Sequence, residues 1–92
     1  MSLNRYARRR DGNEAAIVAA LEAVGCQVER LDRPVDLLVG FRGQTYLMEV
    51  KDPKGRNRLQ ETQSAFLRDW SGGPAVVVRN EEDALCSIGA LD

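Results

Sequence analysis

The sequence predicts an α/β fold with the element order α-β-β-β-α-β-α, in which helices flank a central four-stranded mixed sheet. Apolar residues fill 35–41 and 44–50 on either side of a short Gly-containing turn, which is typical of a β-hairpin. Helical periodicity over 13–24 and 57–70 indicates two amphipathic helices. A fully apolar run at 75–78 favours a strand that is buried on both faces and reached by a right-handed crossover.

Length and composition predict a single domain. The 92 residues have room for one core and one sheet, and the 43% hydrophobic and 29% charged shares are typical of a soluble globular protein. The sequence contains neither an apolar run long enough to cross a bilayer nor a signal-peptide pattern. We therefore expect one domain over residues 1–92, with a flexible basic arm at 1–10, in a cytoplasmic protein that makes no membrane contact.

The first helix is expected over 13–24, and Gly25 is suited to end it. Its apolar face consists of Ile17, Val18, Leu21 and Val24. Glu14 lies along this face, and two explanations for it remain open. It could deliver a third acid to a site on the sheet, or it could be the third residue of a capping box that starts at Asp11. The alternating segment at 26–31 predicts the first strand.

The hairpin is expected to bring two acidic side chains together. If Arg42 and Gly43 form a two-residue turn, Asp36 lies directly opposite Glu49, with Cβ atoms about 4.5–5.5 Å apart. Lys51 follows Glu49 by two residues and therefore lies on the same face. Like charges placed in this way repel each other, and a divalent cation such as Mg²⁺ would offset the repulsion. The sequence therefore predicts a metal site with a lysine beside it.

The second helix is expected to begin at the cap residue Asn57 and to end before Ser71. Its apolar face consists of Leu59, Phe66, Leu67 and Trp70. Gln63 falls on the same face, which suggests a polar site beneath the helix because a buried amide needs partners. Alternatively, Gln63 lies at the helix edge and bonds to backbone or water. A last short helix is expected to open at 80–83, with acids in its first turn.

Basic residues are concentrated in two places, although the net charge is −1. Without three proposed site acids, eleven acidic side chains face thirteen basic ones. Residues 1–10 contain four arginines and no acid, and four more bases follow the hairpin. Arginine-rich tails are often only solvated, but a basic edge beside an acidic site suits chemistry on a phosphate backbone. The proposed DNA contacts are Arg8, Arg9, Arg10, Lys54, Arg56 and Arg58.

The residue types that are present narrow the possible chemistry. The chain has no histidine, which excludes imidazole acid–base catalysis and the usual zinc ligation. Cys26 and Cys86 are far apart in the sequence and are expected to be core thiols in a reduced cytoplasm. Catalysis must therefore use carboxylates, lysine, tyrosine, hydroxyls or a metal held by oxygen.

Taken together, these residues resemble the PD-(D/E)xK nuclease superfamily and, within it, the VRR-NUC family of virus-type replication and repair nucleases. The resemblance spans residues 9–91. It lies in the helical Glu14, in the segment DLLVG-FRG-QTYLMEVKD, and in the following helix LQETQSAFLRDW with Gln63. One departure is that Pro34 precedes Asp36 by two residues, whereas the family's proline usually precedes the aspartate directly.

The resemblance implies a Mg²⁺- or Mn²⁺-dependent DNA endonuclease. It further implies a homodimer that acts on branched DNA such as four-way junctions, in a bacterial or phage context. Asp36 and Glu49 match the metal-binding acids, and Lys51 matches the active-site lysine. Glu14 matches the helix glutamate, which favours its functional explanation. Gln63 matches the helix glutamine, which would orient Lys51 or the attacking water.

We expect Asp36 and Glu49 to hold one metal ion, with the Val50 carbonyl as a further ligand. Glu14 would bind this ion through water or help to hold a second one. The metal would activate water and relieve charge on the phosphate oxygens. Neighbouring carboxylates favour the charged form of Lys51, so we expect it to orient water and stabilise the transition state rather than to act as a base.

Two other functions remain open from the sequence. One is a nucleic-acid-binding module on a catalytically inactive nuclease fold, although a binder gains nothing from acids that face phosphate. The other is a small α/β interaction domain, for which the pairing of acids in the hairpin would be a coincidence.

Overall fold

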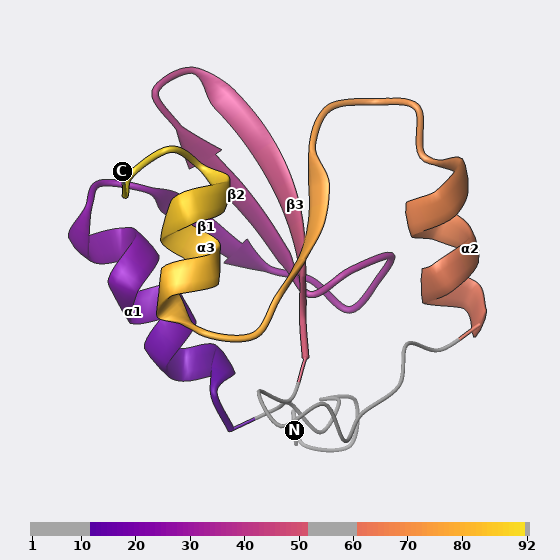
Figure 1. The fold of residues 1–92 in the computed structure, drawn as a ribbon, viewed down its shortest axis with the longest axis horizontal. Coiled ribbons are helices and arrows are strands. Elements are labelled where there is room, and N and C mark those ends of the chain that lie inside the picture. The colour runs from indigo at the N-terminus through magenta and orange to yellow at the C-terminus, as the bar shows by residue number, and fades with distance from the viewer. Residues whose placement is uncertain (1–11, 52–60, 92) are drawn as a thin grey trace, which may run out of the picture.

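One mixed sheet with helices on both sides organises the described part of the chain (Figure 1). The computed structural model describes residues 12–51 and 61–91, without the side chains of residues 61–63. The predicted element order is confirmed as α1 (Glu14–Ala23), β1 (Gln27–Arg30), β2 (Leu37–Phe41), β3 (Gln44–Val50), α2 (Glu61–Asp69), β4 (Ala75–Val78) and α3 (Glu81–Ser87).

A two-residue turn sets the register of the hairpin formed by β2 and β3. Arg42 and Gly43 have φ values of 52° and 80°, and a type I′ turn requires positive φ at both of its central positions. The ladder pairs Val39 with Tyr46 and Leu38 with Leu47. The register predicted from the sequence is therefore confirmed for these residues.

The strands lie in the order β1-β2-β3-β4. The pairs β1–β2 and β2–β3 are antiparallel, and β4 runs parallel to β3. This is the predicted meander followed by a crossover. It places β2 and β3, the strands next to the proposed acidic residues, at the centre of the described sheet.

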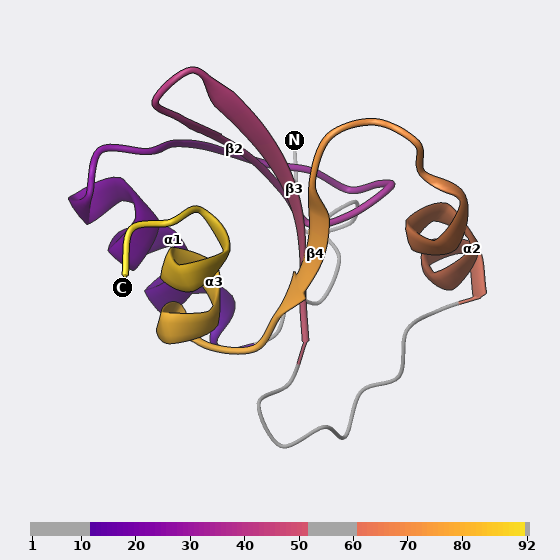
Figure 2. The same cartoon turned by 45° about the horizontal axis from the view of Figure 1, so that its top comes forward.

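The hydrophobic core lies between one face of the sheet and the two helices α1 and α3 (Figures 1 and 2). The fully buried core residues of α1 and the hairpin are Ile17, Leu21, Leu37, Val39 and Met48. Because side chains alternate along a strand, Leu38 and Leu47 point to the opposite face. Both figures place α2 on that second side of the sheet.

The prediction that both faces of β4 are buried is wrong. Val78 is 1% exposed and belongs to the core, but Val77, on the other face of the strand, is 37% exposed. β4 is the edge strand of the described sheet, and α2 stands away from it in both views (Figures 1 and 2). Its four consecutive apolar residues therefore do not indicate cover on both faces.

The second helix is less buried than its sequence predicts. The predicted start at Asn57 lies outside the described residues, as does Leu59. Phe66 and Leu67 are half-buried, and Trp70 follows the end of α2 with 43% of its surface exposed. The apolar face of this helix therefore extends to the protein surface.

The two cysteines are both free but lie in different environments. Cys26 is buried, and burial raises the pKa of its thiol. Cys86 is exposed, so the prediction that it is a core thiol is wrong. The reason is the orientation of α3. The helix turns Ala84 toward the core, and Ile88, which follows the helix, is also buried, so Cys86 faces outward.

Candidate active site

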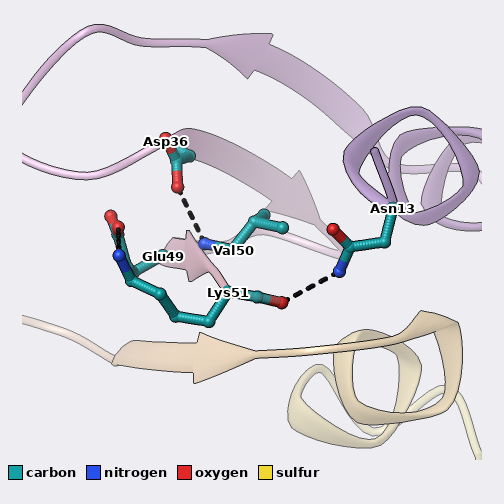
Figure 3. Close-up of polar contacts among 5 residues, drawn as sticks. All are labelled: Asn13, Asp36, Glu49, Val50 and Lys51. Atoms are coloured by element: carbon teal, nitrogen blue, oxygen red, sulfur yellow. Dashed lines mark hydrogen bonds and ion pairs between the residues drawn. The ribbon is translucent and has the colours of Figure 1, made fainter. Parts of the chain in front are cut away.

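Asp36 lies at the entrance to β2 and is held by β3. The β2–β3 ladder ends at the pair Leu37–Met48, and the Asp36 N–H donates to the Met48 carbonyl oxygen at 3.1 Å. Asp36 Oδ2 accepts a hydrogen bond from the Val50 N–H at 2.8 Å (Figure 3). A regular continuation of the ladder would pair Val50 with Val35, so the carboxylate replaces a backbone acceptor. This charge-assisted bond stabilises a carboxylate that is only 5% exposed.

Glu49 lies on β3 and forms a buried ion pair with Lys51. Glu49 Oε2 is 3.2 Å from Lys51 Nζ, and the two side chains are 2% and 9% exposed, respectively. Lys51 directly follows β3, and its side chain folds back along the strand to reach Glu49 (Figure 3). On its other side, Glu49 is the parallel register partner of Val77 in β4. The chain thus supplies a countercharge inside the site.

The Asp36 and Glu49 carboxylates lie on the same side of β3, opposite the Val50 side chain (Figure 3). They are not a regular cross-strand pair as predicted, because the ladder ends at Leu37 and the Asp36 side chain turns to the Val50 N–H. The sequence also suggested a cation to offset their repulsion. In the structure, the Val50 N–H stabilises Asp36 and the Lys51 ammonium group stabilises Glu49.

Asn13, which the sequence did not single out, fixes the end of β3. Among the described residues, the pairing of β3 with β4 ends with a bond from the Lys51 N–H to the Val78 carbonyl oxygen at 3.0 Å. Beyond it, Asn13 Nδ2 donates to the carbonyl oxygens of Lys51 and Arg79 at 3.0 and 2.7 Å. Asn13 is the N-cap residue of α1, but its side chain makes no capping bond. One amide therefore joins α1 to both strands beside the site.

Glu14 is buried at the start of α1, with 2% of its surface exposed. Its Oε2 atom lies 3.4 Å from Arg30 Nε on β1. The capping-box explanation is wrong because α1 begins at Glu14 itself, so Glu14 is not three residues beyond an N-cap at Asp11. Within the described residues, three acids do not gather into a group able to hold a metal, so Glu14 does not complete one with the hairpin acids.

Some of the predicted site residues cannot be placed. Gln63 belongs to the backbone of α2, but its side chain lies outside the described part of the structure. The proposed DNA-contacting residues also lie outside it: Arg8, Arg9, Arg10, Lys54, Arg56 and Arg58. Their predicted roles stay predictions.

Each helix in the described part of the chain is too short or too polar to span a bilayer. Comparisons of the chain with models of known protein families, with curated proteins and with solved structures give no match. The functional conclusion therefore depends on the residues of the site and their geometry.

Proposed function

We propose that this protein is a divalent-metal-dependent endonuclease that hydrolyses phosphodiester bonds in DNA. The observation that carries the proposal is the gathering of two buried carboxylates and one lysine on one side of β3, where β2 begins and β3 ends. Buried charges are costly unless they have partners, and sites of this kind concentrate where a protein does chemistry. As the substrate we propose branched DNA such as a four-way junction, cut by a cytoplasmic homodimer in a bacterial, phage or prophage context.

The donor set fits Mg²⁺ or Mn²⁺. Asp36 and Glu49 supply carboxylate oxygens, and Mg²⁺ typically takes one or two carboxylates and completes its shell with water and phosphate oxygens. The bond from the Val50 N–H does not exclude metal binding, because a carboxylate has two oxygens with several lone pairs. When bound, the ion would make water nucleophilic and relieve negative charge on the phosphate.

Lys51 has a defined task in this proposal. Its ammonium group is held 3.2 Å from Glu49 Oε2, and Asn13 holds its backbone carbonyl. Because both the backbone and the ammonium group of Lys51 are held in place, its positive charge is preorganised to stabilise negative charge that develops on a phosphate oxygen. Orientation of water and stabilisation of charge on the phosphate are therefore its expected roles.

A second function, a nucleic-acid-binding module without catalysis, is favoured by one specific observation. The chain itself supplies a partner for each carboxylate without a metal ion: the Val50 N–H for Asp36 and the Lys51 ammonium group for Glu49. Under this alternative, the protein binds DNA but leaves it intact in the presence of Mg²⁺ or Mn²⁺.

A cleavage panel separates the two functions. Linear, flap, splayed and four-way DNA substrates are incubated with Mg²⁺, Mn²⁺ or a chelator, using the wild type, Asp36→Asn and Glu82→Gln. Glu82 is exposed on α3, so its substitution makes the same charge change away from the site. We expect metal-dependent cleavage by the wild type and Glu82→Gln, preferentially of the four-way substrate, and none by Asp36→Asn. Binding without cleavage by any variant would favour the module.

A further inference from the structure

A mainly apolar groove lies on the side of the sheet that α1 and α3 leave uncovered. Its volume is about 280 Å³. The sheet contributes Leu38, Thr45 and Leu47, and the segment after α2 contributes Trp70, Gly73 and Pro74. None of these lining side chains is charged, so the groove suits a neutral, apolar group.

Trp70 is held in one orientation although 43% of its surface is exposed. Its indole Nε1–H donates to the Gly73 carbonyl oxygen at 2.7 Å, and its ring centroid lies 5.1 Å from that of Phe66. Gly72 lies so close that an added Cβ atom would clash with the ring. An exposed indole that is fixed by three neighbours is preorganised for contact with a ligand.

The groove lies next to the candidate active site along the same two strands. Leu38 follows Asp36 by two residues, Leu47 precedes Glu49 by two residues, and Leu38 and Leu47 are paired in the ladder. Two residues of strand span roughly 6.6 Å, and residues with this spacing share a face. The groove therefore lies within about one nucleotide's length of the two carboxylates.

We propose that this groove binds an unpaired nucleobase, stacked on Trp70, of the same strand whose phosphate reaches Asp36 and Glu49. The inference rests on the proposed function, because it takes the ligand to be nucleic acid. A base is planar, aromatic and neutral, and aromatic side chains provide stacking platforms for unpaired bases. Thr45 adds one polar side chain at the rim. Bases inside a duplex are stacked on each other, so the groove selects DNA with unpaired bases, such as those at a branch or a single-stranded end.

Trp70 is the only tryptophan of the chain, so its fluorescence reports directly on the groove. The protein is titrated with a short single-stranded oligothymidylate in the presence of a chelator, and then with an abasic strand of the same length. We expect the oligothymidylate to quench the fluorescence and the abasic strand to leave it unchanged. Gly72→Ala, which displaces the indole, should abolish the quenching while tryptophan remains present.

Affinity is measured in parallel by the anisotropy of a labelled oligothymidylate. Stacking of one base corresponds to a roughly 5- to 150-fold loss of affinity in Trp70→Ala. Val24 is a matched control, since it is 40% exposed but lies at the end of α1, and Val24→Ala should bind like the wild type. Equal quenching by the abasic strand, or unchanged affinity in Trp70→Ala, would overturn the inference.

Sedimentation tests the competing occupant, a second copy of this chain. A dimer that Trp70→Ala dissociates, combined with no base-dependent quenching, would assign the groove to self-association and overturn base binding. The titrations contain no divalent metal, so they do not depend on catalysis. Quenching without cleavage would contradict the proposed nuclease function but support base binding in the groove. Cleavage without quenching would support the nuclease function and contradict base binding.

Discussion

The Asp36 carboxylate accepts the backbone N–H of Val50 at 2.8 Å, in the position where a neighbouring strand would supply a carbonyl. A side chain proposed to hold a metal thus also completes the backbone hydrogen bonding of β3. The Asp36 carboxylate thus has one role in stability and a proposed role in metal binding. Different substitutions of Asp36 are needed to test the two roles separately.

Asp36→Ala should destabilise the protein by about 1–3 kcal/mol, because it leaves the buried Val50 N–H without an acceptor. Asp36→Asn retains an acceptor oxygen and should cost at most about 1 kcal/mol. Urea unfolding in a chelator gives both free energies. Equal losses for the two variants would show that the bond to Val50 contributes little.

Lys51→Ala should lower the free energy of unfolding by about 3–5 kcal/mol, because it leaves Glu49 charged and buried without its partner. The double variant Lys51→Met, Glu49→Leu should recover much of this loss, since it removes both charges. Arg68 is a suitable control, because its ion pair with Asp69 is exposed and worth only about 0–1 kcal/mol. A Lys51→Ala variant as stable as Arg68→Ala would mean that solvent, not Lys51, stabilises Glu49.

Asn13→Asp distinguishes the two possible roles of Asn13. As a helix N-cap, aspartate is as good as asparagine, so the melting temperature would stay the same or rise. As the donor to Lys51 and Arg79, aspartate places a charged acceptor against two carbonyl oxygens, and we expect it to destabilise more than Asn13→Ala. Gln27→Ala, which removes an exposed side-chain bond on β1, is the control and should change the melting temperature little.

The two thiols should react with a disulfide reagent at different rates. Cys86 is exposed, whereas Cys26 is buried and its raised pKa leaves less thiolate at a given pH. We expect one thiol to be titrated in the native protein and two after unfolding, with Cys86→Ser removing the native reaction. Rapid labelling of Cys26 in the native protein would contradict its burial.

The hairpin could be predicted because its causes are local. Positive φ at Arg42 and Gly43 follows from a turn that glycine supports, and alternation of apolar residues then sets the register. Once the register of Leu38 and Leu47 is known, the shared side of Asp36 and Glu49 follows. The placement of Asp36 and Glu49 on one side of the sheet could therefore be predicted from sequence spacing.

The features that depend on contacts between residues far apart in the sequence could not be predicted. Asn13 directly precedes α1, and its bonds to Lys51 and Arg79 depend on where β3 and β4 end, which the sequence near Asn13 does not show. Trp70 falls on an apolar helical face, but α2 ends before it and leaves it exposed. Four apolar residues in β4 looked buried on both faces, yet periodicity carries no information on whether a helix covers the second face.

Calorimetric titration with Mn²⁺ tests the central claim most directly, using the wild type, Asp36→Asn and Glu82→Gln at equal concentration. We expect the wild type and Glu82→Gln to bind the ion with the same affinity and Asp36→Asn to lose at least about tenfold. Equal affinity in all three proteins, or no binding to the wild type, would contradict a metal site at Asp36 and Glu49.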